Sequence, residues 1–325
     1  PGLWVGFTIE SDGYWLRAEA SQVSPMMGNT WMVWIGIALS VLLPADRVAE
    51  IAQRARAERA DLICVLGGDG TVNEAVNGLL AAGPSPDGPT LAIIPGGSAN
   101  VAARALGLPP DPVEATGEIL QALRERRTRT IGLGRVTITP WEGEAWEPRW
   151  FLANTGLGLD AEIIAAMEDD RAKGHEATPT RYLMTTIRQF LWRTNRREPA
   201  LHAHLPDGEV EGVFVAIVQN TSPWTYFGSL PIAPCPEASF DTGLDLFAVR
   251  RMTFATAMRL ARRMVAGSRA GSTARSLTVA HDLPGLYVGA VRPVPIQVDG
   301  EGLRTVATTT TPTATNWQVR LELKL

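Results

Sequence analysis

The residues best suited to chemistry lie in a short glycine-rich segment, Gly67-Gly68-Asp69-Gly70-Thr71. Glycines permit positive φ angles and let backbone N–H groups come close to an anion such as a phosphate. A carboxylate among them adds a second chemistry, because Asp69 could hold a Mg²⁺ ion or accept a proton from an attacking hydroxyl. The segment therefore predicts a site for a nucleotide phosphate. The alternative is a tight Asp-Gly turn that joins two hairpin strands.

A second glycine-rich segment, Pro95-Gly96-Gly97-Ser98-Ala99-Asn100, follows further along the chain. If both segments follow neighbouring strands of one parallel sheet, they lie at the same edge of that sheet, where open α/β folds bind ligands. One such segment is weak evidence for a nucleotide site, whereas the pair together is considerably stronger.

The elements around the first segment fit this interpretation. Asp61–Leu66 is an apolar run that ends in two glycines, which is typical of a buried parallel strand. Thr71–Leu80 has the periodicity of a helix, and Thr71 and Glu74 have the spacing of a capping box. Helical periodicity after Thr71 favours the phosphate site over the hairpin.

The alternation of helix and strand continues through the first part of the chain. Ala45–Ala60 is an amphipathic helix, Thr90–Ile94 is a strand, and Ser98 is expected to cap a helix that ends near Leu106. Asp111, followed by Pro112, opens another helix. This order predicts a parallel α/β sheet.

The second part of the chain has the spacing of an all-β sandwich, with short strands between glycines and prolines. A domain boundary is expected near Thr130–Arg135. The expected strands are Arg149–Thr155, Ala200–Leu205, Glu211–Gln219, Leu244–Val249, Ser276–His281 and Pro295–Val298, and the expected helices are Asp160–Glu168, Tyr182–Trp192 and Phe254–Val265.

Composition excludes several classes of protein. The 325 residues carry a formal net charge of −4, which argues against a dedicated nucleic-acid binder. The two cysteines, Cys64 and Cys235, form no CxxC pair, so a zinc site or disulfide scaffold is not expected and a reducing cytosol is the simplest compartment. The apolar run Trp31–Leu43 is short for a membrane span and is interpreted as a buried strand or helix. Another interpretation is that residues 1–43 do not belong to the fold.

Several motifs resemble the diacylglycerol kinase catalytic domain, which bacterial lipid kinases share with sphingosine kinases. The strongest are GGDGTVNEAVNGL at 67–79 and PGGSANVAARALGLP at 95–109. Others follow in order at Asn154–Ala161, Asn220-Thr221, Ala238–Asp245 and Val298–Glu301, so the likeness covers about residues 45–301.

The resemblance implies an α/β nucleotide-binding domain with a parallel sheet, followed by an antiparallel β-sandwich domain that carries the lipid site. On this basis residues 1–132 form the ATP-binding domain, with residues 1–43 atypical, and residues 133–301 form the lipid-binding domain. Two features depart from the family: residues 1–43 contain no Asn-Pro pair, and the tail at 302–325 is rich in threonine. An altered reading frame or a truncated domain would account for both.

The resemblance also assigns roles to individual residues. Asp69 and Glu301 are the catalytic acids, and which of them is the base stays open. Asp160 contacts the lipid hydroxyl, with a helix cap as its alternative role. Asp241 and Asp245 hold a supporting metal, with turn residues as the alternative. The nucleotide is bound by Gly67, Gly68, Gly70, Thr71, Glu74, Gly97, Ser98 and Asn100.

The function expected from these residues is ATP- and Mg²⁺-dependent phosphorylation of diacylglycerol or a similar lipid. The expected partner is a lipid at a membrane surface, with a cytoplasmic location and peripheral membrane association; a homodimer stays open. The arginines at Arg188–Arg197 and at Arg259, Arg262 and Arg263 fit either an anionic membrane surface or a solvated helix face. The competing functions are a non-catalytic regulatory protein of the same fold and an NAD kinase, which shares the GGDGT segment.

Overall fold

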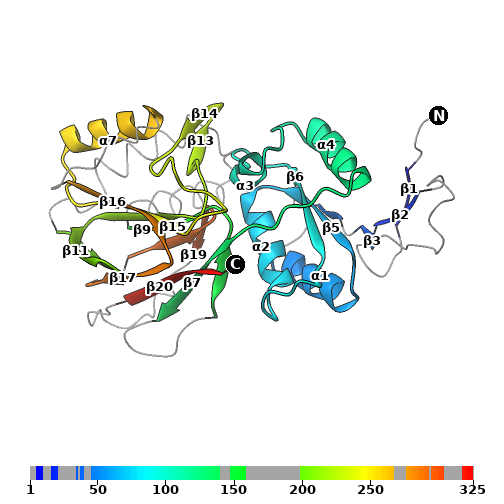
Figure 1. Cartoon of the computed structure of the whole chain (residues 1–325), viewed down its shortest axis with the longest axis horizontal. Helices are drawn as coiled ribbons and strands as arrows, with labels where there is room; N and C mark the ends of the chain where they lie inside the picture. The colour runs from blue at the N-terminus through cyan, green and yellow to red at the C-terminus, as the bar shows by residue number, and fades with distance from the viewer. Residues whose placement is uncertain are drawn as a thin grey trace, which may run out of the picture. The chain divides into compact units, whose positions relative to one another are not determined.

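The computed structural model describes residues 5–9, 16–20, 34–35, 37–39, 45–139, 147–158, 198–266, 276–292, 294–303 and 317–324. The chain forms two compact units, Pro1–Arg129 and Thr130–Leu325 (Figure 1). Three predictions fall outside the described residues: Asp160, the helix beginning there, and the helix at Tyr182–Trp192. The arginine-rich segment Arg188–Arg197 lies outside them as well.

The first unit contains the predicted parallel sheet, in the order β4 (Ile37–Leu39), β5 (Leu62–Gly67) and β6 (Thr90–Pro95). The apolar run Trp31–Leu43 therefore contributes a strand, β4, to this sheet. No helix among the described residues is long and apolar enough to cross a membrane. A separate antiparallel sheet is formed by β1 (Val5–Ile9), β2 (Leu16–Ala20) and β3 (Trp34–Ile35).

Four helices accompany the parallel sheet: α1 (Ala45–Ala57), α2 (Asp69–Leu79), α3 (Val101–Ala105) and α4 (Pro112–Arg124). The predicted start of α4 is confirmed, because the Asp111 carboxylate accepts hydrogen bonds from the N–H groups of Val113 and Glu114. Helices α1 and α2 pack closely at Gly78, where a Cβ atom would lie 2.3 Å from the carbonyl oxygen of Ala49.

Two predicted helix starts are wrong. Helix α2 begins at Asp69, with Gly68 at the N-cap, so Thr71 and Glu74 share the spacing of a capping box without forming one. Helix α3 begins after Asn100, and Ser98 does not cap it. In both cases the N-cap residue itself makes no side-chain capping hydrogen bond. The residue before each helix is part of a glycine-rich segment whose backbone path is set by other contacts.

The second unit contains two six-stranded antiparallel sheets that share one hydrophobic core. One sheet has the order β11-β10-β17-β20-β7-β8, and its strands are Gly208–Val213, Leu201–Leu205, Gly285–Ala290, Trp317–Lys324, Leu133–Thr139 and Arg149–Phe151. The other has the order β16-β15-β12-β9-β18-β19, and its strands are Leu277–Leu283, Leu244–Val249, Val215–Gln219, Asn154–Gly158, Ile296–Val298 and Glu301–Leu303. The predicted combination of a parallel sheet with antiparallel sheets is confirmed.

The threonine-rich tail ends in an element that the sequence did not predict. Strand β20 pairs with β17 on one side and β7 on the other, so it lies inside the first sheet rather than at its edge. The tail therefore contributes a strand to the second unit.

The second sheet is covered on its outer face by α7 (Phe254–Ala266), which confirms the helix predicted at Phe254–Val265. Val215 and Ile217 of β12 pack there with Met252 and Leu260, while the alternate residues of the strand face the shared core. A small hairpin of β13 (Thr225–Phe227) and β14 (Leu230–Ile232) contacts α7.

Candidate active site

The two glycine-rich segments lie against each other in the first unit, as predicted. Strands β5 and β6 are parallel neighbours, so the segments that follow them lie at one edge of the sheet. The N–H of Gly96 donates a hydrogen bond to the carbonyl oxygen of Gly67 at 2.9 Å. A Cβ atom on Gly97 would lie only 2.6 Å from the Cα of Gly68, so this close approach requires glycine.

The first turn of α2 points its N–H groups toward this edge. The first hydrogen bond of the helix runs from the N–H of Val72 to the carbonyl of Gly68 at 3.1 Å. The N–H groups of Asp69, Gly70 and Thr71 therefore lie outside the helical hydrogen-bond pattern. A helix N-terminus of this kind favours an anion, and the exposed backbone of Gly96 and Gly97 lies beside it.

Asp69 connects the two segments. It occupies the first position of α2, and its Oδ1 accepts a hydrogen bond from the N–H of Ala102 at 3.1 Å. Burial raises the pKa of the Asp69 carboxyl, and N–H groups of residues 100–102 oppose that rise without cancelling it. A partly buried carboxylate beside these glycines has the donor chemistry that Mg²⁺ prefers.

Asn100 shapes the second segment. Its backbone is left-handed, with φ of 49°, a conformation that asparagine tolerates better than most residues. Its side-chain amide closes on Gly97 twice: Oδ1 accepts from the Gly97 N–H and Nδ2 donates to the Gly97 carbonyl, both at 2.8 Å. Asn100 thus holds the loop from inside, whereas Ser98 is exposed on it.

The other predicted nucleotide residues have mixed positions. The side chain of Thr71 lies over Gly67, where a Cβ atom would meet it at 2.7 Å. Glu74 is buried on α2, only 9% exposed. The structure therefore places Thr71 beside the first glycine-rich segment and Glu74 in the interior of the first unit.

In the second unit, motif segments far apart in the sequence meet around the carboxylate of Asp299. Its two oxygens accept hydrogen bonds from the N–H groups of Leu152, Ala153 and Asn154 at 2.7, 2.8 and 3.0 Å. Asp299 itself is only 5% exposed. Three backbone N–H donors therefore help to satisfy this buried carboxylate.

Amide side chains extend this network. Gln297 donates from Nε2 to Oδ1 of Asn154 at 2.8 Å, and its Oε1 accepts from the N–H of Gly300 at 2.7 Å. Asn220 donates from Nδ2 to the carbonyls of Gly132 and Leu152 at 2.8 and 2.9 Å. The sequence motifs pointed to these segments, but the network itself depends on long-range strand pairing.

Glu301 follows directly after this network. Asp299 and Gly300 both have positive φ, 48° and 83°, and form the turn between β18 and β19. Glu301 opens β19 and is partly buried. The network therefore fixes the turn that presents Glu301, which lies in the second unit, whereas Asp69 lies in the first.

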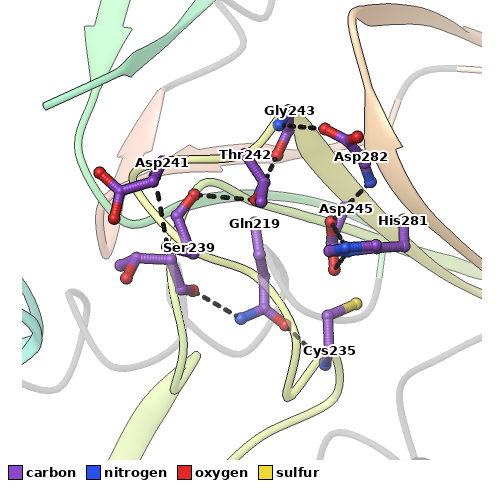
Figure 2. Close-up of polar contacts among 10 residues, drawn as sticks. Gln219, Cys235, Ser239, Asp241, Thr242, Gly243, Asp245, His281 and Asp282 are labelled. Carbon is purple, nitrogen blue, oxygen red and sulfur yellow. Dashed lines mark hydrogen bonds and ion pairs between the residues drawn. The ribbon is translucent and has the colours of Figure 1, made fainter.

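Asp241 and Asp245, the predicted metal ligands, do not gather in one place (Figure 2). Asp241 is exposed, and Figure 2 shows its carboxylate directed away from Asp245. Asp245 is 1% exposed and contacts His281, whose Nδ1 lies 2.8 and 2.9 Å from its two oxygens. Within the described part of the chain, no three acidic, histidine or cysteine side chains form a metal-binding group.

The contact between Asp245 and His281 arises from an irregularity in strand pairing. Leu244 pairs with Leu283 but Leu246 pairs with Ala280, so His281 and Asp282 together face Asp245. The hydrogen bond to Asp245 raises the pKa of His281. Burial raises the pKa of the Asp245 carboxyl, although His281 and the N–H of Asp282 oppose it. Nothing local in the sequence links His281 to Asp245, because the contact depends on the pairing of two strands.

Comparison with known proteins identifies relatives of this fold and site. A family model described as "Diacylglycerol kinase catalytic domain" matches residues 36–136. The "Probable lipid kinase YegS-like" protein of Stenotrophomonas maltophilia is 30% identical over 247 residues, covering 74% of this chain and 72% of that protein. The diacylglycerol kinase of Bacillus subtilis is 42% identical over 93 residues, 28% of each chain.

A solved structure shares the fold. The crystal structure of a diacylglycerol kinase from Bacillus anthracis superposes with a TM-score of 0.55 at 19% identity, covering 87% of this chain and 79% of that one. The match to the Stenotrophomonas protein, at 30% identity over 74% of this chain and 72% of that protein, places the chain in the class of lipid kinases. Within that class, the chain belongs to the family of the diacylglycerol kinase catalytic domain. The family match begins at residue 36 and so includes β4.

Proposed function

We propose that the chain is an ATP-dependent lipid kinase that transfers the γ-phosphate of ATP to the hydroxyl of diacylglycerol or a similar lipid. The observation that carries this proposal is the close contact of the two glycine-rich segments at the N-terminus of α2, with Asp69 between them. The names of the relatives, lipid kinase and diacylglycerol kinase, support the same substrate class.

The chain's own groups would do three things in this reaction. The N–H groups at the start of α2 would bind and orient the phosphates, and the absence of side chains at Gly96 and Gly97 would let a phosphate come close. Asn100 would keep the second loop in its binding shape through its contacts with Gly97. Asp69 would hold a Mg²⁺ ion or accept the proton of the lipid hydroxyl. When bound, ATP supplies the phosphoryl group and Mg²⁺ neutralises its charge.

Glu301 is the second acid of the proposed reaction. The Asp299 network fixes the turn before it, so its position is set by the fold of the second unit. We propose that the Glu301 carboxylate serves the reaction as base or as metal partner.

A transfer assay with labelled ATP tests the proposal. Diacylglycerol, monoacylglycerol, ceramide and sphingosine would be presented in mixed micelles with and without Mg²⁺, and NAD would be tested in parallel. We expect label in a lipid, most strongly in diacylglycerol, and only when Mg²⁺ is present. Label in NAD instead would contradict the lipid substrate, and ATP binding without any transfer would favour a regulatory protein.

A further inference from the structure

Four large apolar side chains are exposed on two neighbouring elements of the second unit. Phe227 and Leu230 flank the turn of the β13–β14 hairpin and are 38% and 42% exposed. Met258 and Val265 lie on α7 and are 50% and 45% exposed. We call these two elements the α7–hairpin surface. Exposed apolar side chains that gather on adjacent elements indicate an interaction surface.

The helix and the hairpin are in contact with each other. Strand β14 contacts α7, and the N–H of Ala233, just after the hairpin, donates to the carbonyl of Met264 at 2.9 Å. Figure 1 shows α7 beside β13 and β14 at the same edge of the second unit. The helix is held from its other side, where Leu260 and Met252 pack on the sheet, so its outward stripe is fixed in orientation.

The outward stripe of α7 is basic as well as apolar. Met258, Arg262 and Val265 follow one another at helical spacing, and Arg259 lies beside them; all four side chains are exposed. The stretch 250–266 contains five arginines and no acidic residue. The stretch 220–235, which includes the hairpin, contains no charged residue. Among the described residues, neither Arg259 nor Arg262 forms an ion pair.

This combination differs from that on α4, which also exposes apolar side chains. Helix α4 exposes Val113, Leu120 and Leu123, but its own sequence contains the acids Glu114 and Glu118. An anionic bilayer would be repelled by those carboxylates, whereas it would attract the arginines of α7. A helix with arginines and apolar side chains on one face lies stably at a lipid interface.

We propose that the α7–hairpin surface docks the protein on an anionic phospholipid bilayer. Phe227, Leu230, Met258 and Val265 would enter the interfacial region, while Arg259 and Arg262 would contact lipid phosphates. The choice of a bilayer as partner rests on the proposed function, because a kinase of membrane lipids must reach its substrate at a bilayer. The α7–hairpin surface consists of side chains outside the two glycine-rich segments.

Vesicle sedimentation of the full chain tests this proposal without ATP or diacylglycerol. The wild type should bind vesicles of phosphatidylcholine mixed with phosphatidylglycerol, bind phosphatidylcholine alone much less, and lose binding at high salt. Arg259→Gln with Arg262→Gln should weaken binding by about tenfold to thirtyfold. Phe227→Ser with Met258→Ser should also weaken binding. Val113→Ser with Arg124→Gln on α4 is the matched control and should bind like the wild type.

Three results would overturn the proposal. The first is that the wild type does not bind anionic vesicles, and the second is that both α7–hairpin variants bind them as the wild type does. The third is that, in sedimentation without lipid, the wild type is a dimer and these variants are monomers. The last would make the surface a contact between copies of the chain. Melting curves would verify that the variants are folded.

A short-chain diacylglycerol that is soluble as monomers separates this proposal from the proposed function. Variants that lose vesicle binding should still phosphorylate the soluble lipid at the wild-type rate, which supports docking. If the wild type phosphorylates no lipid but binds anionic vesicles through these arginines, the proposed function fails and the docking proposal stands.

Discussion

The carboxylate of Asp69, at the start of α2, accepts a hydrogen bond from the backbone N–H of Ala102, at the start of α3, with 3.1 Å between Oδ1 and the nitrogen. This bond joins the two glycine-rich segments, each of which follows a strand of the parallel sheet. The acid proposed for chemistry is therefore also a structural link. A test of its chemical role must remove the charge but keep the hydrogen bond.

The contact between the two loops can be tested at Gly97. In Gly97→Ala, the added Cβ would lie 2.6 Å from the Cα of Gly68, so one loop must move. We expect a loss of about 1–3 kcal/mol in the free energy of unfolding, and a loss of ATP binding by titration calorimetry. Gly117→Ala on α4 is the control, because nothing lies within 4 Å of its added Cβ. Its free energy of unfolding should rise by about 0.5–1 kcal/mol, since alanine favours a helix over glycine. Normal ATP binding by Gly97→Ala would refute a phosphate site at this contact.

The Asp299 network predicts a positioning role for that residue. In Asp299→Asn, one oxygen acceptor becomes an amide donor that faces a backbone N–H. We expect the free energy of unfolding to fall by about 1–3 kcal/mol, as measured by urea titration. Kinase activity should fall further than the folded fraction does, because the turn before Glu301 loses its support.

The exposed Asp207 supplies the matched control for Asp299. Asp207→Asn should leave stability and activity unchanged, because its side chain is exposed next to the glycine that begins β11. If Asp299→Asn keeps full activity at wild-type stability, the network does not position Glu301.

The contact between His281 and Asp245 predicts a pH dependence of stability. The hydrogen bond to Asp245 raises the pKa of His281, so the folded state binds a proton more tightly than the unfolded state does. This stabilisation is fully present below about pH 6.5, the ordinary pKa of histidine, and is lost as the pH rises through the raised value. Burial raises the pKa of Asp245 as well. Protonation of this carboxyl therefore also favours the folded state, but at lower pH than protonation of His281 does.

His281→Asn keeps a side-chain donor but does not titrate. Its unfolding free energy should change less with pH above pH 6.5 than that of the wild type, in urea titrations with EDTA present to exclude metal effects. Equal slopes for the variant and the wild type would show that the Asp245 contact does not shift the titration of His281.

The sequence predicted those parts of the fold whose signals are local. Strand β5 is buried on both faces and so appears as an apolar run, and α4 is capped by the side chain just before it. The start of α2 was misplaced because a glycine occupies its N-cap, while Thr71 and Glu74 happen to have capping-box spacing. Helix-cap patterns identify side-chain caps and cannot detect a start set by loop packing.

Contacts between residues far apart in the chain were harder to predict from the sequence. The meeting of the two glycine-rich segments could be predicted, because parallel strands bring their ends to one edge. The contact of Asp245 with His281 could not, because it depends on a register shift between β15 and β16. Strand β20, near the end of the chain, pairs with β7, the first strand of the second unit in the sequence. No local pattern in the threonine-rich tail indicates this partner.

Asp69→Asn in the lipid kinase assay tests the central claim most directly. Asparagine retains an oxygen that can accept from the N–H of Ala102, so the loops should stay joined and the melting curve should stay close to that of the wild type. We predict that kcat/KM for diacylglycerol falls at least 100-fold, since general-base help alone contributes about 10²–10⁴-fold. A folded Asp69→Asn protein with the activity of the wild type would contradict the assignment of the site to phosphoryl transfer.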